Sequence, residues 1–301
     1  MTERISFYDE IESNKRKSIF LITIVLAMII FFGYLIGLFF IGVAPGIILA
    51  VIAGIIYTLI GYYAGARLIL KTSQAMPATK QMNPFLWNTV EGLSIAAGIP
   101  MPQVYIVNDT AINAFATGRD YNHASVTVTQ GALDKLNRQE LEGVIGHELS
   151  HIKNYDIKVM MLTTVLVGFL VLLSDFFLRA FLYGGRRNDK EGAKVPPLFI
   201  IIGLAFALLT PLIAQLMKLA VSRKREYLAD ANGALLTRYP PGLANALKKI
   251  RDDKEPLVEA ANKATASLWI ENPMKNKRVW LSTLFNTHPD INERIKKLDN
   301  M

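Results

Sequence analysis

The feature that most constrains the fold is an uncharged stretch near the N-terminus. From Ser18 to Ala66 there is no Asp, Glu, Lys or Arg. A helix needs about 20 consecutive apolar residues to cross a bilayer, and the Gly-Val-Ala-Pro-Gly sequence at 42–46 is typical of a turn. We therefore expect two membrane-spanning helices, near residues 19–41 and 47–66. A cleaved signal peptide is the alternative, but this stretch is about twice as long as the apolar core of a signal.

Two weaker apolar blocks follow later in the chain, at 159–183 and 195–217. Asp175 and Arg179 interrupt the first block, and their i, i+4 spacing favours pairing near the membrane interface over a proton relay. We expect a second hydrophobic hairpin over these blocks, either spanning the bilayer or entering it from one side. With 51% hydrophobic residues in all, the chain is expected to be a multi-pass membrane protein.

Basic residues flank the first hairpin on both sides, while the turn between its helices carries none. They are Arg4, Lys15, Arg16 and Lys17 before it, and Arg67, Lys71 and Lys80 after it. Because Lys and Arg accumulate on the cytoplasmic side, we expect both flanks and both termini in the cytoplasm, with the chain in the plasma membrane. The formal charge of +8 suits the anionic lipid of the inner leaflet. No basic stretch interleaved with aromatic residues suggests nucleic acid.

The sequence His147-Glu148-Leu149-Ser150-His151 matches the pattern of a zinc-dependent protease. Histidines four positions apart on a helix project from one face, so both rings can reach one metal ion, with Glu148 within the same arc. A catalytic zinc ion has three protein ligands and an open position for water. The chain has no Cys and only 4 His, so a zinc site here must use His and carboxylates. Two surface histidines matching by chance is the alternative interpretation.

The soluble segment around this pattern reads as mixed α and β structure. A helix is expected at 83–97 and strands at 104–107 and 124–129, where β-branched residues are frequent. The stretch at 113–118 is either an edge strand that pairs with an extended peptide or an ordinary loop. Asn137 with Glu140 three residues later is typical of a helix start, just before the His-Glu-x-x-His sequence.

A third ligand is suggested by Glu226, which with Asp230 forms an i, i+4 pair of carboxylates on an expected helix. Such carboxylates usually lie on a solvated face, but the apolar neighbours here indicate an interior position, where unpaired acids are costly. If Glu226 meets both histidines, the chain must cross the membrane an even number of times between residues 152 and 225. The two soluble segments, 67–158 and 218–301, then form one domain.

Four stretches of the chain resemble the HtpX family of membrane metalloproteases, and the order of apolar blocks matches that family over essentially the whole chain. They are residues 113–118, 143–156, 225–230, and Thr287-His288-Pro289 through Glu293-Arg294. One departure is Gly146, where many relatives carry Ala. The family comprises integral membrane zinc endopeptidases with a cytoplasmic active site, implicated in stress-related quality control of membrane proteins. It is related to the CAAX prenyl proteases.

The resemblance implies a role for each matching residue. The zinc ligands would be His147, His151 and Glu226, with Glu148 as general base and acid. Asp230 would hold a ligand histidine from behind, Arg294 would pair with Asp230, and His288 would stabilise the oxyanion. The substrate backbone would add as a strand along Asn113, Ala114, Phe115 and Ala116.

We therefore expect a multi-pass α-helical membrane protein with a cytoplasmic α+β metalloprotease domain of the zincin (gluzincin) type. The expected segments are an N-terminal segment 1–18, a transmembrane hairpin 19–66, the first part of the catalytic domain 67–158, a second hairpin 159–217, and the second part 218–301. The expected activity is zinc-dependent endoproteolysis of membrane or misfolded proteins, with one zinc ion per subunit, protein substrates and the lipid bilayer as partners.

Three other functions remain possible on the sequence. A membrane binding protein that keeps the zinc site without cleaving its clients is the first, but it would have no need of Glu148. A structural zinc protein is the second, but only three ligands are visible. A transporter is the third, but the apolar blocks carry few of the ionisable residues that mark an ion path.

Overall fold

The computed structural model describes residues 42–163, 223–253, 268–270 and 289–301, together with Glu255 and scattered positions between 16 and 37. The expected first span, residues 19–41, is therefore described only at scattered positions and not as a continuous helix. Nearly all of the expected second hairpin at 159–217, including Asp175 and Arg179, lies outside the described residues, and so does His288.

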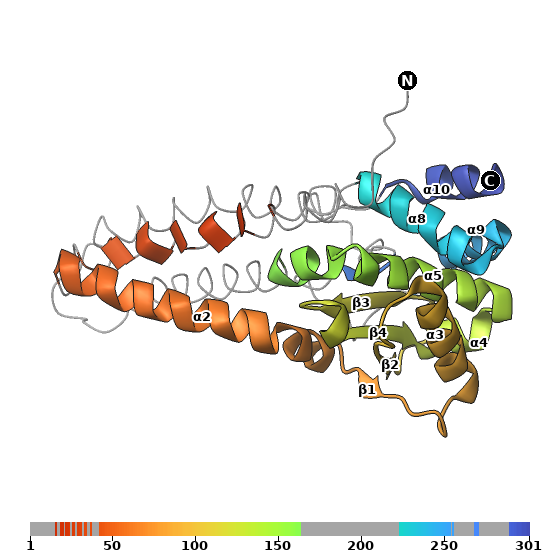
Figure 1. Cartoon of the computed structure of the whole chain (residues 1–301), viewed down its shortest axis with the longest axis horizontal. Coiled ribbons are helices and arrows are strands. Elements are labelled where there is room, and N and C mark those ends of the chain that lie inside the picture. The colour runs from red at the N-terminus through yellow and green to blue at the C-terminus, as the bar shows by residue number, and fades with distance from the viewer. Residues whose placement is uncertain are drawn as a thin grey trace, which may run out of the picture.

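Helix α2, Val43–Thr72, contains the second expected span in full and continues past it. It is the one helix among the described residues that is long and apolar enough to cross a membrane. Arg67 and Lys71 lie within its last two turns, so the helix carries the chain out of the apolar stretch before it ends. Figure 1 shows α2 projecting away from the sheet and the helices packed on it.

The described chain after α2 is built on a four-stranded mixed sheet with strand order β1-β2-β4-β3. The strands are β1 (Met76–Pro77), β2 (Gln103–Val107), β3 (Ala114–Gly118) and β4 (Ala124–Thr129). β2 and β4 run parallel, and β1 and β3 pair with them antiparallel at the two edges. The two expected strands are confirmed, and the stretch left open between edge strand and loop is the edge strand β3.

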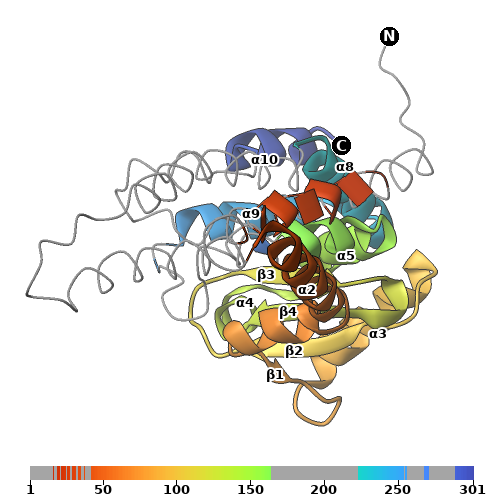
Figure 2. The same ribbon diagram turned by 90° about the vertical axis from the view of Figure 1, so that its left-hand side faces the viewer.

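Helix α3, Pro84–Ala97, confirms the expected helix, with the Asn83 side chain accepting a hydrogen bond from Leu86 N at its start. After the short α4, Gln130–Lys135, helix α5 spans Arg138–Lys153 and begins with the expected capping box of Asn137 and Glu140. Helices α8 (Arg223–Thr237), α9 (Pro240–Asp252) and α10 (Ile291–Asp299) complete the domain. In Figure 2 the sheet forms one layer, α5 lies on it, and α8, α9 and α10 lie beyond α5.

Two hydrophobic clusters hold these layers together. The larger one fills the space between the sheet and α5, where Val126, Val128, Ile145 and Leu149 are completely buried. The smaller one joins the end of α2 to β3 and to Leu268 and Trp269, and it includes the ring of Phe115. Helix α5 therefore packs between the sheet and α8. The smaller cluster links α2 to the edge strand β3.

Candidate metal centre

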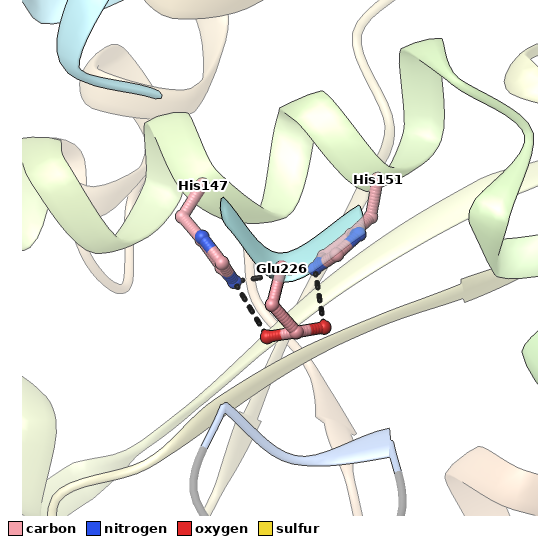
Figure 3. Close-up of side chains that lie close together, drawn as sticks. All are labelled: His147, His151 and Glu226. Atoms are coloured by element: carbon pink, nitrogen blue, oxygen red, sulfur yellow. Dashed lines mark hydrogen bonds and ion pairs between the residues drawn. The ribbon is translucent and has the colours of Figure 1, made fainter. Parts of the chain in front are cut away.

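Three potential metal ligands converge at the crossing of α5 and α8. Figure 3 shows His147 and His151 pointing from α5 toward the carboxylate of Glu226 on α8. The two Nε2 atoms lie 3.2 Å apart. Glu226 Oε2 lies 3.8 Å from His147 Nε2, and Glu226 Oε1 lies 3.6 Å from His151 Nε2. All three side chains are buried, so the arrangement can hold a metal ion out of contact with bulk solvent.

These separations suit a tetrahedral ion. Zinc binds His nitrogen at about 2.0–2.1 Å and carboxylate oxygen at about 2.0–2.2 Å, so two of its ligand atoms lie about 3.3–3.5 Å apart. The three distances found here, 3.2, 3.6 and 3.8 Å, differ from that range by a few tenths of an ångström. Two histidines and one glutamate also leave a fourth position for water, which is the ligand set of a catalytic site rather than a structural one.

Each ligand histidine is held from behind by a second carboxylate. His147 Nδ1 lies 2.9 Å from Asp230 Oδ1, and His151 Nδ1 donates to Asp156 Oδ2 at 3.0 Å. A proton on Nδ1 of His151 leaves the lone pair on its Nε2, the atom that faces Glu226, so Asp156 selects the tautomer that binds metal. Asp230 lies at ion-pair distance from His147.

Two buried arginines in turn hold these carboxylates. Arg294 donates to both oxygens of Asp230, at 2.9 Å from Nε and 2.7 Å from Nη2, and to the carbonyl of Ile270 at 3.1 Å. Arg225 lies next to the ligand Glu226 in the sequence and pairs with Asp156, at 3.5 Å from Nη1 to Oδ1. The bidentate arginine fixes the plane of the Asp230 carboxylate, and through it the His147 ring.

The buried charges favour a cation at the point of convergence. Burial alone lowers the pKa of His151, but the hydrogen bond to Asp156 and the charges of Glu226, Asp156 and Glu148 outweigh it and raise the pKa to about 9. For His147 burial dominates, and its pKa is lowered despite Asp230. For Asp230 burial raises the pKa, but the Arg294 charge and the contact with His147 bring it down to about 2. This carboxylate is therefore ionised at neutral pH.

Buried acidic side chains outnumber buried basic ones around the site. Among the described residues there, the buried acids are Glu148, Asp156, Glu226 and Asp230, and the buried bases are Arg225 and Arg294. Buried charge without compensation is costly, and a cation bound between the two histidines and Glu226 would lower this cost.

Glu148 and the remaining expected residues take different places. The Glu148 side chain is buried beside the two histidines on α5, and its charge acts on the His151 ring. Asn113 precedes β3, and Ala114, Phe115 and Ala116 lie in that strand. The structure thus brings together Glu148, the three ligands, Asp230 and Arg294, while His288 lies outside the described residues.

Sequence reasoning assigned no role to Asp156, Arg225 or Ile270, although all three contact residues of the site. The available signal for Asp156 is its position five residues after His151. The chain there leaves α5 through Asn154 and turns at Tyr155, which adopts a positive φ of 60°, so the aspartate returns to the ring. No local pattern points to Ile270, which reaches Arg294 through the fold alone.

Comparison with known proteins agrees with this geometry. Residues 80–301 match the model of peptidase family M48, which is well over half of the chain. The chain belongs to this family. The M48 match includes both segments that supply the His, His and Glu group, and membership of this family makes the chain a metallopeptidase.

Curated relatives in this family match nearly the full length. The chain is 46% identical to the protease HtpX homolog of Dictyoglomus turgidum, over 98% of this chain and 95% of the relative. It is 42% identical to the protease HtpX homolog of Lactobacillus helveticus, over 98% and 99%. The resemblance to HtpX proteases is therefore confirmed. The chain is a membrane-associated metallopeptidase that acts on proteins, and an inactive binding protein is not favoured.

A solved structure supports the fold. The crystal structure of S. mikatae Ste24p superposes with a TM-score of 0.52 at 20% sequence identity, covering 95% of this chain and 66% of the Ste24p chain. At this identity the likeness concerns the fold alone.

Proposed function

We propose that this M48 peptidase is a zinc-dependent endopeptidase whose active site faces the cytoplasm and whose substrates are membrane or misfolded proteins. The observation that carries the proposal is the buried His147, His151 and Glu226 group, with ligand atoms within 4.8 Å of one another. Zinc is preferred over other divalent ions because two imidazoles and one carboxylate with an open fourth position are a zinc ligand set.

The residues around the group would divide the work of peptide hydrolysis. A zinc ion bound there supplies an activated water and polarises the scissile carbonyl. Glu148 takes the proton from the attacking water and passes it to the leaving amine. Asp230 and Asp156 keep both rings in the Nδ1–H tautomer throughout. His288 is proposed to stabilise the developing oxyanion, as the resemblance to the HtpX family implies.

The substrate backbone is proposed to bind along the edge of β3 that does not pair with β4. The Ala114 carbonyl points away from β4 and accepts a hydrogen bond from Ile270 N at 2.9 Å. Next to it, the Phe115 and Trp269 rings pack edge to face with centroids 4.6 Å apart. The carbonyl that an added strand would use is thus already used by the chain itself. An extended substrate pairing along Asn113–Ala116 takes the place of Ile270 at this carbonyl.

The cytoplasmic orientation is supported by the basic residues at the end of α2 and by the contact between α5 and α8. Arg67 and Lys71 follow the uncharged stretch in the last turns of α2, just before the chain enters the sheet. Basic residues at the end of a span favour the cytoplasmic side. Because His147 and Glu226 meet, the proposal puts α5 and α8 on the same side of the bilayer as Arg67 and Lys71.

The proposal is tested by removing the ligand contributed by α8. In Glu226→Ala we expect zinc content, measured by elemental analysis of detergent-purified protein, to fall well below one ion per chain and casein cleavage to stop. The control is Glu91→Ala, which removes an exposed carboxylate on α3 that pairs with Lys80 and should leave both measurements unchanged. Full zinc content in the Glu226 variant would refute the ligand role of this residue.

A further inference from the structure

A pocket outside the metal centre lies where the apolar helix meets the sheet. It has a volume of about 190 Å³ and is walled by the end of α2, by β2, and by the segment that joins β3 to β4. Its polar walls are formed by Tyr62, Tyr63, Arg67, Tyr105, Arg119 and His123. We call it the interfacial pocket. A water molecule takes up about 30 Å³ in the liquid, so the pocket has room for a group of several heavy atoms.

The position of the pocket along α2 places it at the level of the lipid headgroups. The helix has 30 residues and is therefore about 45 Å long at 1.5 Å per residue. The hydrocarbon core of a bilayer is about 30 Å thick, which takes about 20 residues. Counted from residue 47, where the expected span begins, that length ends at Ala66, directly before Arg67, the first charged residue after the uncharged stretch. Tyrosines followed by an arginine are the residues that anchor a helix at the interface.

The charges at the pocket favour an anion. The Arg119 guanidinium lies over the Tyr63 ring at 5.1 Å and near the Tyr62 ring at 5.8 Å, which holds it in place. The nearby acid, Asp120, is shared between Arg119 at 3.6 Å and His123 at 2.8 Å. Among the described residues no carboxylate lies within ion-pair distance of Arg67 or Lys158. Lys158 adds a further positive charge 5.5 Å from the Tyr62 ring.

An apolar track on α2 leads from the membrane to the pocket. Ile56, Ile60, Tyr63 and Arg67 follow one another at intervals of four, three and four residues, so they lie along one face of the helix. Ile56, Ile60 and Tyr63 are large, and about half or more of each is exposed. A ligand with a charged head and an apolar tail could contact both the basic residues of the pocket and the apolar face of α2. A free anion would contact only the basic residues.

We propose that the interfacial pocket binds the phosphate of an anionic phospholipid, with the acyl chains along the Ile56–Tyr63 face of α2. Arginine is suited to phosphate because its fork of N–H groups donates to two oxygens at once. Phosphatidylglycerol combines an anionic phosphate with two acyl chains and is the lipid that we assign to the pocket. The inference depends on α2 lying in a membrane but not on the zinc site, so either assignment can fail without the other.

The test measures lipid retention by native mass spectrometry of the full chain in mixed phosphatidylglycerol and phosphatidylcholine micelles. We expect the wild type to retain phosphatidylglycerol in preference. One basic residue near an anionic lipid contributes a factor of about five in affinity, so Arg67→Gln should lower phosphatidylglycerol occupancy about fivefold, and Arg67→Gln with Arg119→Gln further. Because Arg67 is exposed, the single variant tests the pocket even if the double variant loses packing on the tyrosines.

The matched control is Lys71→Gln, which removes a charge one turn further along α2 and outside the pocket wall. Occupancy should change little in this variant. An equal loss of phosphatidylglycerol occupancy in Lys71→Gln and Arg67→Gln would show diffuse attraction to a charged surface. It would overturn the proposal that the pocket binds the lipid. Equal retention of phosphatidylcholine would also overturn it. If inorganic phosphate alone displaces phosphatidylglycerol from the wild type, the ligand is a free phosphate and the lipid assignment is wrong.

Discussion

Helices α2 and α5 both depart from the usual distribution in a folded protein, in which apolar side chains are buried and charged side chains are exposed. In α2 the large apolar side chains point outward, with Ile48 and Leu49 about 60% exposed, while its buried positions are mostly glycines. In α5 the buried residues include Glu140, His147, Glu148 and His151. Helix α2 therefore exposes apolar side chains to its surroundings, whereas α5 buries ionisable side chains.

This departure has a different physical cause in each helix. Apolar side chains on the outside of α2 are stable where the surroundings are lipid, which also requires that the backbone satisfy its own hydrogen bonds, as a helix does. Charged groups inside α5 are stable because each has a partner, Glu140 with Lys249 at 2.7 Å and His151 with Asp156 at 3.0 Å. The pattern of buried residues in α2 therefore indicates the medium around the helix. In α5 the same kind of pattern indicates the chemistry of the site.

The largest effect is expected at the centre of α5. Glu148→Gln keeps the shape of the side chain but removes its ability to take a proton, and general acid–base catalysis contributes about 10²–10⁴-fold. We expect casein cleavage to fall by that factor while zinc content stays unchanged. Glu142→Gln, on the same helix but paired with Arg138 at the surface, is the control and should cleave normally. Wild-type cleavage by the Glu148 variant would remove this residue as the base.

The second prediction concerns how the charge inside is kept stable. Arg294→Met leaves Asp230 buried without its bidentate partner, and breaking a buried pair costs about 3–5 kcal/mol of the free energy of unfolding. Lys248→Met breaks an exposed pair with Asp299 at 2.9 Å, which is worth at most about 1 kcal/mol. Denaturation of both variants in the same detergent measures the difference. Similar midpoints would mean that the Asp230 and Arg294 pair does not hold the site together.

The third prediction tests whether the outside of α2 faces lipid. Ile55→Lys places a charge near the middle of the expected span at 47–66, at a cost of about 2.5–3.5 kcal/mol for insertion. We expect a lower inserted fraction in a glycosylation-based membrane insertion assay. Ile95 on α3 is even more exposed, at 76%, but lies outside the expected membrane spans. Ile95→Lys should leave insertion unchanged, and equal effects at both positions would argue against lipid around α2.

The smallest effect is expected where α8 touches α5. A Cβ at Gly233 would lie 2.8 Å from the backbone nitrogen of His147, whereas a Cβ at Gly92 on α3 would have nothing within 4 Å. Overpacking costs about 1–3 kcal/mol, so Gly233→Ala should lower both thermal stability and zinc occupancy by separating Glu226 from the histidines. Gly92→Ala should instead stabilise the protein by up to about 1 kcal/mol. The reverse order would mean that the two helices do not need this close approach.

The parts of the site that could be predicted are those carried by local spacing. The four-residue interval places His147 and His151 on one face of a helix whatever surrounds it, and the capping box of Asn137 and Glu140 starts that helix through contacts within a single turn. The stretch at 113–118 could not be decided in the same way, because a short apolar run suits an edge strand or a loop equally. Pairing with β4 settles it as a strand.

The sequence alone determined that the N-terminal part is too apolar for water and that one helix carries paired imidazoles and a carboxylate. These properties depend on residue type and on the period of the helix. The tertiary structure decided the rest, since Glu226 lies 75 positions after His151 and Asp156, Arg225, Arg294 and Ile270 reach the centre from four different parts of the chain. Such meetings depend on how helices pack and where the chain returns, and the energy of those contacts exists only once the layers are assembled.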